Sequence, residues 1–298
     1  MGEADDRDLE GTPPEPEAEP EQGFVRELAQ FFIVPSLIVL LCVGVFIMFG
    51  LISSESKGVR DFLQEIRSSR GTDRWQAAFE MSRAIAQQPA LRADEGLVRE
   101  ISGVIGDEGR DDPKVRKYLI IALENLGNRS AGPALIAALA DPDPEVRLQA
   151  ARALGAIGGI DGSAGPLIAL LSDEDAGIRK VAIYALGRTR DPVAIPALRP
   201  KLEDTSEDIR WNAALALAVL GDGSGRTVIE QMIDRRHLDT IDGITEEQKV
   251  GAIINGIQAV YLLHDRSFLQ AVEELSRKDP SLKVREIAIK VLESLGNA

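Results

Sequence analysis

The feature that most restricts the fold is a short repeat that fills the C-terminal part of the chain. An aliphatic residue followed by arginine recurs at Val115-Arg116, Val146-Arg147, Ile178-Arg179 and Ile209-Arg210. The arginines are therefore 31, 32 and 31 residues apart. A unit of this size cannot bury an apolar face by itself and is stable only when stacked on its neighbours. The spacing predicts a stacked array of small units over residues 73–298.

Each unit carries a helical pattern. After Arg147, small or aliphatic residues stand at positions +3, +6, +7 and +10, which form one stripe on a helix. Arg285 repeats this frame, and weaker copies begin at Arg74 and Lys249. A second helix is expected in the units of Arg116, Arg147 and Arg179. A proline suited to a first helical turn follows the first helix of each, namely Pro133, Pro166 and Pro196. The fold class predicted is all-α.

Two phrases resemble a known family. DPDPEVRLQAARALGAIG and SAGPLIALLSDEDAGIRKVAIYALG are similar to HEAT repeats of the short bacterial type related to phycobilisome (PBS) lyases. The resemblance implies a right-handed α-solenoid. It also implies a structural role for the arginine of each pair, which in such proteins contacts turn carboxylates of neighbouring repeats. This structural ladder comprises Arg116, Arg147, Arg179, Arg210 and Arg285.

The chain departs from the regular pattern twice. Between Arg210 and Lys249 the spacing rises to 39 through the segment 234–243, which predicts a protruding loop. The chain also ends after the helix that begins near Arg285, which predicts a half-repeat acting as a cap. HEAT arrays usually curve so that the second helices of the units line the concave face, and we expect the same arrangement here.

An apolar segment precedes the repeats. Residues 28–54 contain no charged residue, and Phe31–Ile52 is almost entirely hydrocarbon. At about 1.5 Å per residue, 22 residues would cross a bilayer core of about 30 Å. The sequence therefore predicts a single transmembrane helix at 28–54. A cleaved signal peptide is less consistent, since a basic n-region and an A-x-A-like site are missing.

The flanking charges predict the orientation of that helix. Only Arg7 and Arg26 precede it, whereas Lys57, Arg60, Arg67 and Arg70 follow it closely. The positive-inside bias places the repeats in the cytoplasm and the N-terminal tail outside the inner membrane. Residues 1–27 are rich in Pro and Glu and predict a disordered acidic tail.

A juxtamembrane helix is expected within residues 55–72. Val59, Phe62, Leu63 and Ile66 have the spacing of one helix face. This amphipathic helix could lie on the bilayer surface or pack on the first element of the following domain. The mixed charge of its polar face favours packing on the domain.

Composition excludes several functional classes. The 298 residues hold 34 Lys and Arg against 48 Asp and Glu, a net charge of −14, which disfavours nucleic-acid binding. One cysteine (Cys42) and two histidines (His237 and His264) exclude a Cys/His zinc cluster. No phosphate-binding loop, nucleophile elbow or H-E-x-x-H motif is present. We therefore expect no catalytic, metal or cofactor site.

A protein partner is the remaining expectation. Trp211 and Tyr184 fall at +1 and +5 of their helices, away from the buried stripe. Trp75 and Phe79 hold the same two positions in the first unit, unless the helix at 59–66 covers them. Charged residues of the second helices and of the 234–243 segment could form a docking surface for an anionic partner: Arg199, Lys201, Arg226, Glu230, Arg235, Arg236 and His237.

These observations predict a membrane-anchored HEAT-repeat scaffold or adaptor that recruits a protein at the cytoplasmic face. The first alternative is an accessory subunit of an integral-membrane transport or electron-transfer complex. A more distant alternative is an enzyme resembling the bilin lyases, in which only the repeats would be shared. The identity of the partner is not encoded in these patterns.

Overall fold

The computed structural model describes residues 32–53, 58–69, 71–107 and 112–296. The chain divides into two compact units, Met1–Ser56 and Lys57–Ala298. The predicted acidic tail lies outside the described residues. Every regular element in the described part is a helix, so the predicted all-α class is confirmed.

The first unit contains helix α2 (Val34–Ser53), which carries no charged residue. Its described side chains, from Pro35 to Met48, are exposed. Within the part of the chain that the structure describes, no helix is long and apolar enough to cross a membrane. The transmembrane helix predicted at 28–54 is thus unsupported by the structure.

The second unit alternates two kinds of helix. The helices that begin with an aliphatic–Arg pair or its weaker copies are called V-R helices here. They are α4 (Thr72–Ala86), α6 (Pro113–Leu126), α8 (Pro144–Ile157), α10 (Ala176–Thr189), α12 (Glu207–Val219), α15 (Glu246–Leu263) and α17 (Leu282–Gly296).

The intervening helices alternate with the V-R helices along the chain, starting with α3, and each packs on the V-R helix that follows it. They are α3 (Val59–Ser68), α5 (Glu95–Asp107), α7 (Gly132–Ala138), α9 (Ala164–Ala169), α11 (Ile195–Leu198), α13 (Arg226–Ile233) and α16 (Leu269–Lys278). Short 3₁₀ turns extend several of them, such as η5 (Leu170–Ser172) and η7 (Arg199–Glu203). The insertion contributes α14 (Arg235–Asp239).

Helix α3 belongs to this array. Val59, Leu63 and Ile66 are buried, and the Nε of Arg74 in α4 donates a hydrogen bond of 2.9 Å to the carbonyl of Ile66. Of the two placements considered for this amphipathic helix, the structure has the one in which it packs on the domain.

The phase of the repeat differs from the prediction. Because α16 precedes α17 and packs on it, the last unit is a complete helix pair, and the predicted half-repeat is wrong. Similarly, α3 pairs with α4 at the other end. A periodic pattern has no intrinsic starting point, so the arginine spacing alone cannot show which helix opens a unit.

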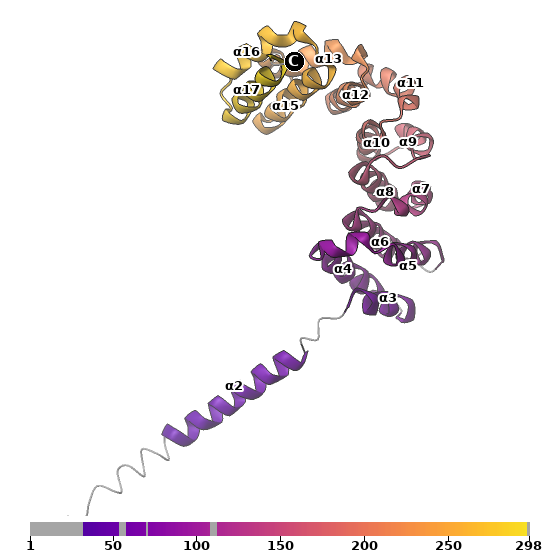
Figure 1. Cartoon of the computed structure of the whole chain (residues 1–298), viewed down its shortest axis with the longest axis vertical. Coiled ribbons are helices and arrows are strands. Elements are labelled where there is room, and N and C mark those ends of the chain that lie inside the picture. Colours follow the sequence, from indigo (N-terminus) through magenta and orange to yellow (C-terminus); the bar gives the residue numbers. More distant parts are fainter. Residues whose placement is uncertain (1–31, 54–57, 70, 108–111, 297–298) are drawn as a thin grey trace, which may run out of the picture. The chain divides into compact units, whose positions relative to one another are not determined.

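Small residues bring consecutive V-R helices close together. A side-chain carbon placed on Gly187 of α10 would stand 3.0 Å from the Cα of Ala216 in α12. Figure 1 shows α4, α6, α8, α10 and α12 along one side of the array, and the array of residues 57–298 bends toward that side. The V-R helices therefore line the inner face, and the expectation that the second helices line it is wrong.

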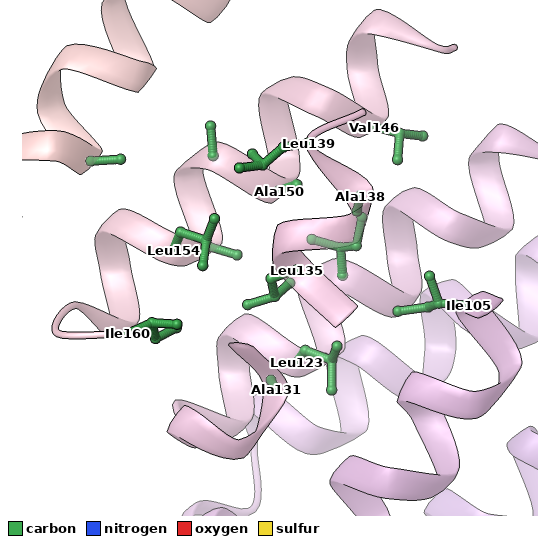
Figure 2. Close-up of a cluster of buried hydrophobic side chains, with 14 of the residues drawn as sticks. Ile105, Leu123, Ala131, Leu135, Ala138, Leu139, Val146, Ala150, Leu154 and Ile160 are labelled. Carbon is green, nitrogen blue, oxygen red and sulfur yellow. The ribbon is translucent and has the colours of Figure 1, made fainter. Parts of the chain in front are cut away.

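The core between the two layers consists of two clusters of buried residues, one from α3 to α12 and the other from α12 to α17. In its central part, Leu123 of α6 and Leu154 of α8 meet Leu135 and Leu139, which come from α7 and the residue after it (Figure 2). These four side chains are almost fully buried. The right-handed sense of the solenoid stays a prediction.

Candidate functional site: charged turns, an outer groove and an inner aromatic face

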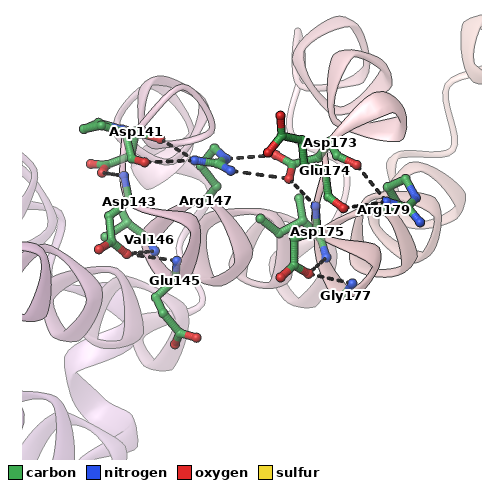
Figure 3. A network of polar contacts seen from close by, with 12 residues as sticks. Asp141, Asp143, Glu145, Val146, Arg147, Asp173, Glu174, Asp175, Gly177 and Arg179 are labelled. Atoms are coloured by element: carbon green, nitrogen blue, oxygen red, sulfur yellow. Dashed lines mark hydrogen bonds and ion pairs between the residues drawn. The ribbon is translucent and has the colours of Figure 1, made fainter.

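The turns that precede the V-R helices hold aspartates in a repeated arrangement. The side chains of Asp143 and Asp175 accept main-chain N–H bonds at the start of α8 and α10. Two residues earlier, Asp141 and Asp173 each accept the N–H of that capping aspartate, at 2.9 Å (Figure 3). The carboxylates of Asp141 and Asp173 can accept further hydrogen bonds, and they face the preceding V-R helix.

Two arginines donate these further hydrogen bonds and so link neighbouring units. Arg116 holds Asp141 through two hydrogen bonds, Nε to Oδ2 at 2.7 Å and Nη2 to Oδ1 at 2.9 Å. The side chains are 7% and 10% exposed, so this ion pair is nearly dry. Arg147 holds Asp173 in the same way, at 2.9 and 3.3 Å. Bidentate, charge-assisted pairs of this kind fix geometry as well as adding energy.

The electrostatic effect of this pairing is visible at Asp173. Burial raises the pKa of its carboxyl, whereas hydrogen bonds from Arg147 and from the main chain of Asp175 lower it. The lowering prevails, so the pKa of Asp173 lies below its ordinary value. The ionised form of Asp173 is therefore the one that stabilises the fold.

The other predicted ladder arginines bond mainly to their own turns. An Nη1 donates to the carbonyl six residues earlier, from Arg179 to Asp173, from Arg210 to Asp204 and from Arg285 to Asp279. Arg147 makes the same bond to Asp141. Among the described contacts, only Arg116 and Arg147 of the five also pair with a carboxylate of the next unit.

The insertion supplies the cation for the last such turn. Asp279 precedes α17 as Asp141 precedes α8, and it is held by Arg235 through bonds of 2.8 and 3.0 Å. The side chain of Asp279 is fully buried and that of Arg235 is 18% exposed. These hydrogen bonds, with that to Glu246, raise the pKa of Arg235. Arg235 is therefore engaged within the fold, and its role as a docking residue stays a prediction.

The neighbours of Arg235 differ from it. Arg236 is exposed, and its side chain has no hydrogen bond or ion pair among the described residues. His237 is half-buried, and its Nε2 is buried without a partner there. Lys249, which occupies the arginine position of the weak repeat copy, pairs with Asp239 of the insertion at 2.5 Å. The insertion is thus tied down at both ends rather than protruding freely.

An outer groove between α13 and α16 collects several of the predicted docking residues. It is a cavity of about 540 Å³ lined by Arg226, Glu230, Arg235 and Arg236, with Phe268 among its apolar residues. Most of its charges are already matched. Arg226 bonds Asp265 at 2.6 Å and Ser267 at 2.8 Å, lies 3.2 Å from Glu230, and stacks 4.7 Å from the ring centre of Phe268.

Arg199 and Lys201 lie on η7, away from that groove. Arg199 pairs with Asp222 at 2.6 Å. Burial raises the pKa of Asp222, but the bonds from Arg199 and Ser224 outweigh it and the pKa is lowered. Lys201 donates to the carbonyl of Leu171. The docking residues predicted on second helices therefore belong to the outer layer, and the structure does not bring them into one surface.

The inner face carries the aromatic residues. The Tyr118 ring lies 6.3 Å from that of Trp75 in a stacked arrangement and 5.3 Å from that of Phe79 edge-on. Lys114 and Lys117 sit over the Trp75 and Tyr118 rings at 5.4 and 5.9 Å. The sequence analysis did not name Tyr118, because it considered aromatic residues only at +1 and +5 after the arginine, and Tyr118 stands at +2 after Arg116. A large aromatic residue outside the buried stripe was the signal that could have identified it.

Two predicted aromatics differ in exposure. Tyr184 of α10 is 46% exposed, as predicted for position +5. Trp211 of α12 is only 7% exposed, so the prediction that it faces solvent is wrong. The cover comes from the insertion, since Ile241 and Ile244 pack against the apolar cluster that contains Trp211. In the described residues, no three His, Cys, Asp or Glu side chains are grouped as metal ligands.

Comparison with known proteins agrees with this architecture. The model of the HEAT-repeat family matches residues 108–165 and 164–246, so this part of the chain consists of HEAT repeats. Comparison with the curated proteins finds no match.

One solved structure shows the same fold at low identity. The complex of CpcE and CpcF of phycocyanin lyase from Nostoc sp. PCC7120 is 22% identical with a TM-score of 0.50, over 81% of this chain and 96% of that chain. A designed armadillo repeat protein in complex with the peptide (KR)4 is 18% identical with a TM-score of 0.47, over 80% and 100%. At 22% identity the similarity to CpcE and CpcF concerns the fold alone.

Proposed function

We propose that the chain is a HEAT-repeat adaptor that binds a protein partner along the inner face of residues 57–298. The observation that carries the proposal is the set of exposed aromatic rings on V-R helices, with Phe79 39% and Tyr184 46% exposed. Neither position is needed to fill the core. Large aromatic side chains at a surface are enriched among residues that dominate binding energy.

Site-specific crosslinking tests this assignment. A photoreactive amino acid replaces Phe79 or Tyr184 in the full chain, and the same residue replaces the exposed Val193 of the outer layer as a control. We expect one adduct of constant mass from both inner positions and none from Val193. Adducts from Val193 alone would contradict the proposal.

The membrane anchor is part of this proposal. The sequence supports this part of the proposal, because the 22 residues Phe31–Ile52 would reach about 33 Å as a helix at about 1.5 Å each, against a bilayer core of about 30 Å. The described apolar side chains of α2, such as Leu40 and Phe46, are exposed within their unit and would be covered by lipid. In the proposed topology the anchor lies in the inner membrane, the tail is outside and the repeats are cytoplasmic.

Membrane extraction tests the anchor. We expect the full chain to stay in the membrane fraction after an alkaline carbonate wash, and a Leu40→Arg, Phe46→Arg variant to be released. Protease added to intact spheroplasts should remove the N-terminal tail and spare the repeats. Digestion of the repeats with protection of the tail would reverse the proposed orientation.

A non-catalytic role completes the proposal. The similarity to CpcE and CpcF favours a lyase only weakly, because 22% identity reaches no further than the fold. Titration of the purified chain with a free bilin tests this alternative. We expect no saturable change in the bilin absorption spectrum, and a saturable change would reopen the lyase alternative.

A further inference from the structure

The outer groove between α13 and α16 is bridged by an arginine at each end. Arg226, the first residue of α13, bonds Asp265 at 2.6 Å and Ser267 at 2.8 Å, just before α16 begins. Arg235, directly after α13, bonds Asp279, directly after α16, at 2.8 Å. The two bridges set the spacing of the helices, so the cavity of about 540 Å³ between them belongs to the folded chain.

An apolar stripe lines the groove between the two bridges. Phe268, Ala271 and Leu275 all line it, and their spacing by three and four residues puts them on one side of α16. At about 1.5 Å per residue, the stripe is about 10 Å long. Ile233 adds an apolar side chain from α13. A groove of this volume lies within the range of about 300 to 1,000 Å³ that is usual for binding sites.

One cation at the edge of the groove has no partner. The two bridging arginines are paired as described, and Lys278 pairs with Glu274 at 3.1 Å. Arg236 also lines the groove, but it is exposed, and its side chain makes no ion pair or hydrogen bond among the described residues. The neighbouring Asp234 accepts the main-chain N–H of Arg236 at 3.0 Å instead. The guanidinium of Arg236 is therefore available to a bound group.

The charge of the chain makes this cation selective. With a net charge of −14, most of the surface repels an acidic segment. A neutral apolar segment in the groove would cover Arg236 without pairing it, which costs free energy, and a basic segment would be repelled there. The groove therefore favours a segment in which a carboxylate stands beside aliphatic side chains.

We infer that the outer groove docks an amphipathic acidic segment of a partner protein. Its aliphatic side chains lie along Phe268, Ala271 and Leu275, and one of its carboxylates pairs with Arg236. An arginine and a carboxylate form charge-assisted, often bidentate hydrogen bonds, which fix the register of the segment as well as adding affinity.

This surface lies on the outer layer and is additional to the inner face proposed above. The two proposals can fail separately, because crosslinking from Phe79 and Tyr184 does not involve Arg236. An adaptor with both surfaces would hold two segments at once, one on each layer.

Peptide binding to the full chain tests the groove. The chain is placed in nanodiscs of phosphatidylcholine, and empty nanodiscs serve as the blank. The probe is a dye-labelled, acetylated and amidated peptide of repeated Glu-Glu-Leu-Leu units, followed by fluorescence anisotropy. We expect saturable binding of this peptide, and binding weaker by about tenfold or more when Gln replaces Glu or Ser replaces Leu. No saturable binding, or equal binding of the three peptides, overturns the inference.

Variants then locate the contact. Arg236→Glu should weaken binding of the Glu-Leu peptide about tenfold without changing the melting temperature. Arg277→Glu is the matched control, because Arg277 is an exposed residue of α16 outside the groove and the change in net charge is the same. It should weaken binding by less than about twofold. Ala271→Phe, which fills the groove, should weaken binding as well. Equal losses from the two Arg→Glu variants would mean attraction by overall charge and would overturn the inference.

Discussion

The regular repeats and the irregular part after α13 use different residues to pair with the aspartate of a buried turn. In the regular part, Arg116 and Arg147 stand in V-R helices and reach the turn aspartate of the next unit. After α13 the corresponding helix position holds Lys249, which pairs with the insertion instead. The buried Asp279 is then held by Arg235, which the insertion itself provides.

The comparison shows that the aspartate of a buried turn can be paired by an arginine from a different position in the chain. A buried carboxylate is tolerated only when a cation and further hydrogen bonds satisfy it. Asp279 meets this condition through Arg235 and through the N–H of Ser281. An insertion that lengthened the unit without supplying a cation would leave that carboxylate unpaired.

The largest effect is expected from breaking the regular pair. Arg116→Ala leaves Asp141 charged in a site where both side chains were nearly dry, so the free energy of unfolding should fall by about 3 kcal/mol. Urea unfolding of the full chain, followed by helical circular dichroism, measures the loss. Arg277→Ala removes one arm of an exposed pair with Glu273 and should change stability by less than about 0.5 kcal/mol. Equal losses of unfolding free energy from the two variants would show that the Arg116–Asp141 pair stabilises the fold no more than an exposed ion pair does.

The next effect tests whether the insertion is structural. Arg235→Ala should lower the free energy of unfolding by about 2 kcal/mol, less than Arg116→Ala because Arg235 is more exposed. Its neighbour provides the control, because Arg236→Ala removes a side chain without a described partner and should have almost no effect. Loss of partner capture by Arg235→Ala at unchanged stability would restore the docking role predicted from sequence.

The sequence is sufficient to predict the helices but not their layers. The period of 31–32 residues and the Ala-rich stripe after each arginine predict where the V-R helices run, and the described helices follow that pattern. The period does not say which layer is inner. The bend of the array toward the V-R helices decides it (Figure 1).

The candidate site was less predictable because it depends on contacts across long stretches of chain. Trp211 is covered by Ile241 and Ile244, about thirty residues later in the chain, and no pattern in the sequence around Trp211 predicts this contact. The Arg235–Asp279 pair joins residues 44 positions apart. Tyr184 needed no such information, because its exposure follows from its helix face alone.

Crowding between neighbouring V-R helices should destabilise the fold less than the loss of either arginine. Gly187→Val places a branched side chain against the backbone of Ala216 and should destabilise the fold by about 1 to 2 kcal/mol. A side-chain carbon placed on Gly251 of α15 would have no neighbouring atom within 4 Å, so Gly251→Val should be neutral or slightly stabilising through helix propensity. Thermal unfolding of both variants separates crowding from propensity, and equal melting temperatures would mean that the layers are loosely packed.

The smallest effect expected is the pH dependence of one regular ladder pair. The pKa of Asp173 is lowered in the folded chain, so its stabilisation is present above the unfolded value of about 3.9 and is lost as the pH falls through the folded value. Asp173→Asn should reduce the free energy of unfolding by about 1 kcal/mol at pH 7, and this difference from the wild type should shrink below about pH 4. Asp161→Asn, at an exposed loop position, should give no difference at either pH. Urea unfolding at pH 7, 5 and 3.5 measures the gap, and a gap that widens toward acid would mean that the Arg147–Asp173 pair does not depend on the ionised carboxylate.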